Sequence, residues 1–118
     1  MQSMQRKNDT GMAKKESQIM KEIQMEATKH GCRLFRNQVG NYVLADGRRI
    51  QSGLCVGSAD LIGWTKTGIF LSVEVKRPGG RISPEQLKWR DAVIDACGYA
   101  CVCHSVEEFI EFISTVSH

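Results

Sequence analysis

Hydrophobic residues recur at helical spacing in three stretches of the chain. The first stretch runs from Lys14 to His30 and ends before Gly31, a residue type that often follows a helix. The other two begin at Ser83 and Ser105, each of which can cap a helix in a capping box. Three amphipathic helices are therefore predicted. The residues expected to be buried along them are Ile19, Met20, Ile23 and Ala27, then Trp89, Val93, Ala96 and Cys97, and finally Phe109, Phe112, Ile113 and Val116.

Alternation with a period of two predicts strands between these helices. Residues Cys32–Gln38 and Tyr99–His104 form two of them. The clearest signal is a hairpin that joins residues 60–64 to residues 69–76, and a looser stretch from Gly40 to Gly57 precedes it. The order helix, strand, two hairpin strands, helix, strand, helix predicts an α/β fold: a mixed β-sheet flanked by α-helices.

The hairpin brings acidic and basic side chains together. In its second strand Glu74 and Lys76 share one face, and the opposite face is wholly aliphatic and must be buried. A four- or five-residue turn places Asp60 opposite Val73 or Glu74, so the carboxylates of Asp60 and Glu74 should approach each other. Adjacent carboxylates repel each other. A divalent cation relieves this repulsion, and Lys76 relieves it in part.

The chemistry of this group is that of a metal-dependent phosphodiesterase. Hard divalent cations prefer oxygen ligands, which Asp60, Glu74 and the backbone carbonyl of Val75 can supply. The cation would polarise a phosphodiester and activate a water, and Lys76 can hold that water or neutralise developing charge. The competing interpretation is a surface ion-pair cluster on a structural sheet.

Two helical residues are candidates to join the site. Glu16 lies within the apolar stripe of the first helix, where a carboxylate is costly unless it meets a cation or hydrogen-bond donors. Alternatively, Glu16 simply favours the helix N-terminus as an acid in the first turn. Gln86 completes the capping box with Ser83 and lies on the same side as Val93, so it can face inward as well as cap.

Composition and length are consistent with one globular domain. The chain has 118 residues, of which 25% are charged and 42% hydrophobic. Residues 1–13 are polar without periodicity and are expected to be mobile, which leaves residues 14–118 as a single domain. No apolar run is long enough for a membrane span and the N-terminus lacks the pattern of a secretory signal, so a cytoplasmic location is expected.

The five cysteines are expected to be free thiols in a reducing compartment, because their number is odd and no C-x-x-C pair occurs. Cys97, Cys101, Cys103 and His104 are an alternative zinc cluster. Their spacing matches none of the usual structural zinc patterns. A buried strand that carries small residues is the favoured interpretation.

The net charge of +3 is small, but its distribution is informative. Arg36, the pair Arg48 and Arg49, and the residues Arg77 and Arg81 form basic groups, and the last two adjoin the acidic site. Positive charge around a small acidic centre suits a polyanionic substrate such as DNA. The alternative is a set of solvated basic loops.

Several motifs together resemble the VRR-NUC branch of the PD-(D/E)XK nucleases. They are residues 57–61 (GSADL), 73–76 (VEVK) and 80–89 (GRISPEQLKW), with 16–17 (ES) and 36–40 (RNQVG). The matches extend over about residues 16–113. Their combination is far more specific than the Glu-x-Lys pair alone.

The resemblance implies a restriction-endonuclease-like core and Mg²⁺- or Mn²⁺-dependent hydrolysis of DNA phosphodiesters. Asp60 and Glu74 match the metal-binding acids, and Lys76 matches the catalytic lysine. Glu16 matches the acid of the first helix and Gln86 the glutamine that supports the site.

Ala59 departs from the family pattern, which usually has proline before the aspartate. Because that proline does no chemistry, altered local stiffness with retained activity is expected. Compact stand-alone forms are similar to phage or bacterial proteins that pair as homodimers, act on branched DNA such as Holliday junctions or flaps, and work beside helicases in replication and repair. Two other functions stay open: a catalytically silent nucleic-acid-binding module, and a restriction-type, sequence-specific endonuclease.

Overall fold

The computed structural model describes residues 14–116, so the segment 1–13 that was expected to be mobile lies outside the described residues. Within residues 14–116, none of the helices has the length and apolar character needed to cross a membrane. In chain order the elements are α1 (Glu16–Lys29), β1 (Arg33–Arg36), β2 (Gly40–Val43), β3 (Arg49–Ser52), β4 (Leu61–Trp64), β5 (Phe70–Val75), α2 (Pro84–Asp95), β6 (Tyr99–Cys103) and α3 (Val106–Val116).

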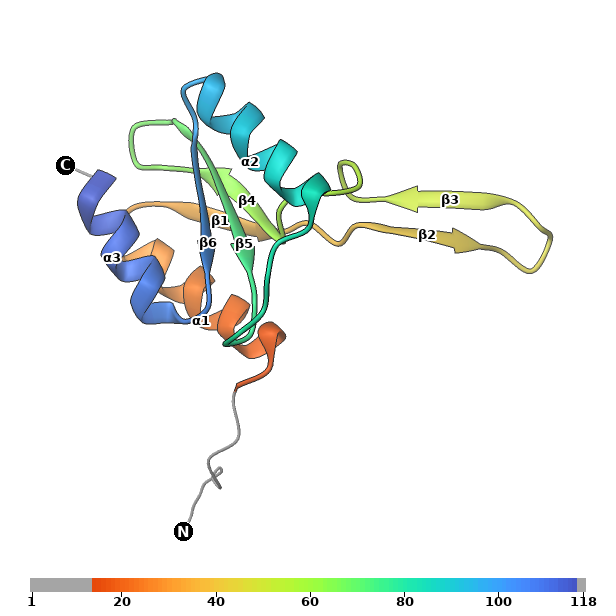
Figure 1. The fold of residues 1–118 in the computed structure, drawn as a ribbon, viewed down its shortest axis with the longest axis horizontal. Coiled ribbons are helices and arrows are strands. Elements are labelled where there is room, and N and C mark those ends of the chain that lie inside the picture. Colours follow the sequence, from red (N-terminus) through yellow and green to blue (C-terminus); the bar gives the residue numbers. More distant parts are fainter. Residues whose placement is uncertain (1–13, 117–118) are drawn as a thin grey trace, which may run out of the picture.

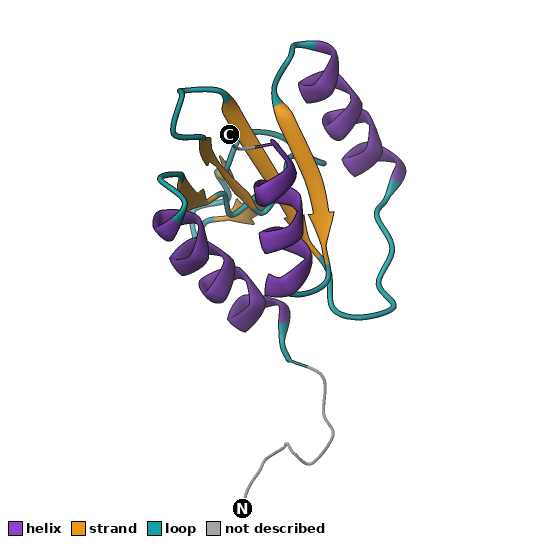
Figure 2. Ribbon diagram, turned by 90° about the vertical axis from the view of Figure 1, so that its left-hand side faces the viewer, coloured by secondary structure: helices purple, strands orange, loops and turns teal. Residues whose placement is uncertain are grey.

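A four-stranded mixed sheet forms the centre of the molecule. Its strand order is β1-β4-β5-β6; β4 is antiparallel to both β1 and β5, whereas β6 is parallel to β5. Helices α1 and α3 pack on one side of this sheet and α2 on the other (Figure 2). The expected α/β fold, a mixed sheet flanked by helices, is confirmed.

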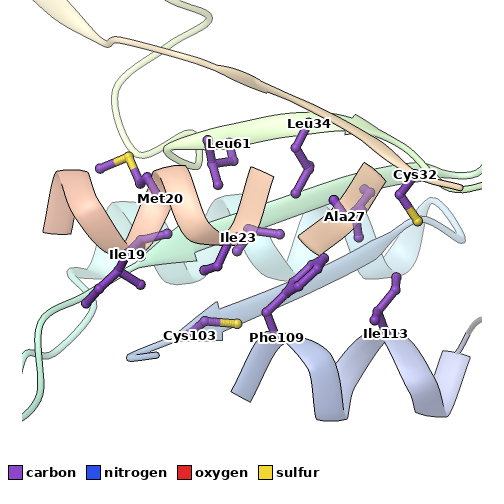
Figure 3. Close-up of a cluster of buried hydrophobic side chains, with 13 residues drawn as sticks. Ile19, Met20, Ile23, Ala27, Cys32, Leu34, Leu61, Cys103, Phe109 and Ile113 are labelled. Atoms are coloured by element: carbon purple, nitrogen blue, oxygen red, sulfur yellow. The ribbon is translucent and has the colours of Figure 1, made fainter. Parts of the chain in front are cut away.

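The hydrophobic core lies between the sheet and the pair α1 and α3 (Figure 3). Leu71, Val73 and Val75 are completely buried there, which confirms that the aliphatic face of the hairpin strand faces inward. The α1 stripe and two residues of α3 close the core, while Phe112 and Val116 pack at its margin. The buried residues from these two helices are Ile19, Met20, Ile23, Ala27, Phe109 and Ile113.

The central hairpin has the expected register. Leu61 pairs with Val73, and continuing the antiparallel register by one residue places Asp60 opposite Glu74. At the turn, Gly68 has a φ of +86°, a conformation that glycine adopts without strain. This turn therefore fixes which side chains of β4 and β5 meet.

The stretch from Gly40 to Gly57 differs from expectation because it contains two strands. Among the described residues, strands β2 and β3 pair only with each other, with Gly40 opposite Ser52 and Val43 opposite Arg49. This two-stranded hairpin, called the arm (residues 40–52), projects away from the four-stranded sheet (Figure 1). Its side chains are largely exposed, which explains why no clear hydrophobic alternation announces it in the sequence.

Helix α2 begins as expected and ends differently. Ser83 and Gln86 form the full capping box, with Pro84 at the start of the helix. The predicted burial of Ala96 and Cys97 is wrong, because both are exposed. The helix ends at Asp95 and Cys97 adopts a φ of +69°, so the chain turns towards β6 before another helical turn can pack on the sheet.

Candidate active site

Two carboxylates meet where β4 begins and β5 ends. The backbone N–H of Val75 donates to Asp60 Oδ2 at 2.9 Å, which holds the Asp60 side chain against the end of β5. Glu74 projects from β5 towards the same place and is only 6% exposed. The turn-defined register and this hydrogen bond together bring the two acids side by side, as the sequence predicts.

Glu74 is buried with incomplete hydrogen bonding. Its Oε2 accepts from Gln86 Nε2 at 2.8 Å and lies 3.8 Å from Lys76 Nζ. Among the described residues its other oxygen, Oε1, is buried and has no hydrogen-bond partner. Burial, followed by the nearby Asp60 carboxyl, raises the pKa of Glu74 to about 8, although Lys76 acts in the opposite direction. An ionised acid pair at neutral pH thus needs further positive charge.

Gln86 performs both tasks that its position suggested. Its Oε1 accepts from the backbone N–H of Ser83, which completes the α2 capping box, while its Nε2 donates to Glu74. Because both ends of the amide are bonded, its orientation is fixed. Gln86 therefore ties the start of α2 to the acidic pair.

Glu16 of α1 lies close to the acid pair of Asp60 and Glu74. It is the first residue of α1 and is partly buried, and its Oε2 accepts from the backbone N–H of Arg77 at 3.2 Å. Its charge also contributes to the raised pKa of Glu74. Both interpretations of Glu16 agree with this position: it is an acid in the first turn of a helix, and it faces the chain just after the end of β5.

The residues present fit a divalent cation that keeps several waters. Across residues 14–116, no three side chains of His, Cys, Asp or Glu are gathered closely enough to enclose a metal ion. Mg²⁺ is commonly bound through one or two carboxylates, with water in its remaining positions. Asp60, Glu74 and the Val75 carbonyl form such a partial set, and the unpartnered Glu74 Oε1 is an oxygen suited to a cation. The role of Glu16 as a further ligand stays a prediction.

The alternative zinc cluster of Cys97, Cys101, Cys103 and His104 is not gathered closely enough to enclose a metal ion. Cys101 and Cys103 lie on the same face of β6 with their sulfurs 3.6 Å apart, and Cys97 is exposed at the end of α2. Both nitrogens of His104 face oxygen acceptors instead, namely the Glu108 carboxylate at 3.0 Å and the Gly80 carbonyl at 3.1 Å.

The predicted DNA-binding arginines fall into three places. Arg36 ends β1 and lines a hollow that also contains Asp60, while Arg77 and Arg81 are exposed in the loop directly after Lys76. Arg48 and Arg49 lie instead towards the far end of the arm (Figure 1), where Arg48 Nε is 2.7 Å from Asp46 Oδ2. Of the five arginines, Arg36 thus shares a hollow with Asp60, two follow the acidic site in the chain, and two lie away from it on the arm.

A buried asparagine that the sequence reasoning assigned no role organises the approach to Asp60. Asn37 Nδ2 donates to Ser58 Oγ and to the Ala59 carbonyl, both at 2.8 Å, and its Oδ1 accepts from the Leu54 N–H at 3.0 Å. Its own N–H donates to the Asp60 carbonyl at 2.8 Å. Only its place in the quoted RNQVG motif could have indicated it, because a single polar residue leaves no periodic signal.

A mixed sheet whose hairpin ends in an acidic pair and a lysine, with a helix glutamine behind the acids, is the arrangement of a PD-(D/E)XK-type nuclease. The VRR-NUC domain family matches residues 8–107, and the chain belongs to that family. A solved structure titled "VRR_NUC domain" has the same fold, with a TM-score of 0.59 and 21% identity, over 84% of this chain and 94% of that chain. No curated protein matches the sequence. Family membership indicates a nuclease domain that acts on nucleic acid.

Proposed function

We propose that this protein is a Mg²⁺- or Mn²⁺-dependent DNA endonuclease that hydrolyses phosphodiester bonds. The observation that carries the proposal is the buried Glu74 beside Asp60: among the described residues its Oε1 has no hydrogen-bond partner, and its Oε2 lies 3.8 Å from the ammonium of Lys76. Burying one acid beside a second acid is unfavourable for folding alone. The presence of the pair is explained if the site holds a cation and a phosphate.

Each side chain has a distinct role in this proposal. Asp60 and Glu74 hold the cation, which when bound supplies positive charge at the scissile phosphate. Lys76 lies on the same strand face as Glu74, where it holds the attacking water or stabilises the charge that develops on the phosphate. Gln86 fixes the Glu74 carboxylate, and Glu16 stays near the strand end as a water or metal ligand.

Branched DNA is the proposed substrate, on the basis of the family resemblance and the placement of positive charge. Arg36 lines a hollow with Asp60, and Arg77 and Arg81 are exposed in the loop after Lys76; such residues can fix the phosphate backbone without reading base sequence. Recognition of DNA structure is favoured over restriction-type recognition of sequence, because contacts to phosphates carry no sequence information. A helicase or another replication and repair protein in the cytoplasm is the partner that the resemblance implies.

Cleavage of duplex, flap, splayed and four-way DNA in Mg²⁺ and in Mn²⁺ tests the proposal. Lys76→Ala and Asp60→Ala should each reduce cleavage by a factor of about 100 or more, since transition-state stabilisation is lost. Lys66→Ala, an exposed lysine in the turn at the opposite end of the hairpin, is the matched control. Circular dichroism verifies that all variants are folded.

The proposal fails if Lys76→Ala and Asp60→Ala cut as fast as the parent. A second outcome would favour a catalytically silent binding module: salt-dependent DNA binding by the parent without cleavage in either metal. The two alternatives therefore give different results in one set of assays.

We further propose that the protein is a homodimer, because one site cuts one strand and a two-fold pair can cut both. Leu54, directly after the arm, is 51% exposed, and it supports the segment 40–57 as the contact surface, at the end of that segment nearest the sheet. Tyr42 and Val43 of β2 stay outside this proposed contact. Light scattering should give about twice the monomer mass, and Leu54→Arg should reduce it; a monomeric parent contradicts the proposal.

A further inference from the structure

A hollow of about 580 Å³ lies beside the acidic pair, between the base of the arm, α1 and the start of α2. Asp60 and Gln86 line it on the catalytic side, and Arg36 lines it at the end of β1. Sites for small ligands typically have volumes of roughly 300 to 1,000 Å³. The hollow is therefore larger than a phosphate requires, and it adjoins the place where the phosphodiester would be cut.

The lining of this hollow combines apolar surface with one positive charge, away from the acids Asp60 and Glu85 that also line it. Met20, Val39, Tyr42 and Val56 provide apolar side chains, and Arg36 provides a guanidinium. A groove that contacts only phosphate and sugar needs hydrogen-bond donors and cations, but it has no use for an apolar wall. A nucleotide, with its flat base and its anionic phosphate, matches both parts of the lining.

Tyr42 offers a flat surface to such a base. Tyr42 and Gly40 lie on the same face of β2, and a Cβ atom on Gly40 would lie only 2.9 Å from Tyr42 Oη and 3.0 Å from Cζ. The ring therefore folds back over Gly40, towards the base of the arm, and yet the residue is 53% exposed. An aromatic ring that is held in place and half open is suited to stack on a base.

The arm is also fixed relative to the catalytic acids. Asn37 is 8% exposed and connects the N–H of Leu54, just after the arm, to the carbonyl of Ala59, just before Asp60. Fully bonded buried polar groups make rigid connections. Tyr42 and Asp60 therefore line the same hollow as parts of one framework.

We propose that this hollow receives one unpaired nucleotide of the DNA strand, directly beside the phosphate to be cut. Its base stacks on Tyr42 and its flanking phosphate pairs with Arg36. The inference rests on the proposed nuclease function and adds the feature of the substrate that the enzyme selects. Selection arises because a paired base is stacked on its neighbours and must leave the helix to enter, whereas a nucleotide at a branch is already free.

Fluorescence of 2-aminopurine, placed at successive positions through a branched DNA and a matched fully paired duplex, tests the proposal. Binding is measured without added metal, so that no strand is cut. The variants are Tyr42→Ala, Tyr42→Phe, which keeps the ring, and Val43→Ala as a control. Val43 is 66% exposed and its side chain leaves the opposite face of β2.

The parent should quench 2-aminopurine at one unpaired position beside the mapped cut site. Tyr42→Ala should abolish this quenching and weaken binding to the branched DNA by about 5- to 150-fold, the range that corresponds to the loss of one aromatic stack. Tyr42→Phe should retain the quenching. Val43→Ala should behave like the parent, and binding to the paired duplex should change in none of the variants.

The inference is overturned if Tyr42→Ala weakens binding to branched and paired DNA equally, or changes neither. The results that would reject the nucleotide site differ from those that would reject the nuclease proposal. Loss of cleavage in Lys76→Ala without any selective effect of Tyr42→Ala would retain the nuclease and reject the nucleotide site. Position-specific quenching by a parent that cuts no DNA would retain the nucleotide site and reject the nuclease.

Discussion

The Glu74 carboxyl should make the free energy of unfolding of the metal-free protein depend on pH. Burial and the neighbouring Asp60 carboxyl raise its pKa from 4.5 to about 8 in the folded protein. Between these values the folded state keeps a proton that the unfolded state has released. The stability that this proton contributes is therefore fully present below pH 4.5 and is lost as the pH rises through about 8.

The size of this effect follows from the two pKa values. They differ by about 3.5 pH units, and at about 1.4 kcal/mol for each unit the upper bound is near 5 kcal/mol. Because Asp60 is only partly buried, water can reach the pair and lessen the repulsion, so we expect a change of roughly 2 to 4 kcal/mol. Glu74→Gln removes the charge at nearly constant shape and should abolish this dependence.

Urea unfolding in EDTA at pH 5 and at pH 8.5 measures the difference for the parent and for Glu74→Gln. Comparing the two proteins cancels the pH dependence of all other groups. Glu22→Gln is the control, because the carboxylate of Glu22 pairs with Lys14 at 2.9 Å on a different part of the surface. At pH 8.5 Mg²⁺ should then stabilise the parent and leave Glu74→Gln largely unaffected.

The reasoning is refuted if the parent and Glu74→Gln lose the same stability between pH 5 and pH 8.5. A parent that Mg²⁺ does not stabilise at the higher pH would separately contradict the assignment of the acid pair as the cation site.

Three further predictions concern the scaffold. Phe109→Ala should lower the free energy of unfolding by about 3 to 5 kcal/mol in urea titrations, because Phe109 is completely buried in the core. Gly57→Ala should lower the free energy of unfolding and slow cleavage in the branched-DNA assay, since Gly57 has a φ of +90°, a Cβ there would lie 2.6 Å from the Glu85 carbonyl, and Gly57 lines the same hollow as Asp60. The hydrogen bond to the Glu108 carboxylate raises the pKa of His104 above 6.5. The stability that the protonated His104 contributes is therefore fully present below pH 6.5 and is lost as the pH rises through the raised pKa. His104→Gln should therefore lower Tm at pH 5.5 and have little effect at pH 8.5.

The hairpin and its acid pair could be predicted from the sequence because a few local rules determine them. A four-residue turn limits the register to one or two possibilities, and alternation then assigns Glu74 and Lys76 to one face. The two roles of Gln86 also follow from local information, since a capping box fixes its position and the helical repeat fixes its direction.

The arm and the end of α2 could not be predicted in the same way. Strands β2 and β3 bury little surface, so selection for a hydrophobic face leaves no pattern in residues 40–57. The exposure of Cys97 depends on its positive φ, which a cysteine seldom adopts and which helical periodicity does not reveal. The position of Tyr42 beside the acids likewise depends on the path of the arm, which tertiary contacts determine.

The same contacts explain how two repelling carboxylates stay together in a protein of this size. Asp60 is held through its side chain by the Val75 N–H and through its carbonyl by the Asn37 N–H, while Gln86 holds Glu74 from the capped start of α2. Packing and hydrogen bonds elsewhere must therefore supply the free energy that opposes the repulsion. It follows that Glu74→Gln should make the metal-free protein more stable at high pH and, in the same step, abolish cleavage. Stability and catalysis would then be opposed at one side chain, as expected where a site is arranged for a ligand instead of for folding.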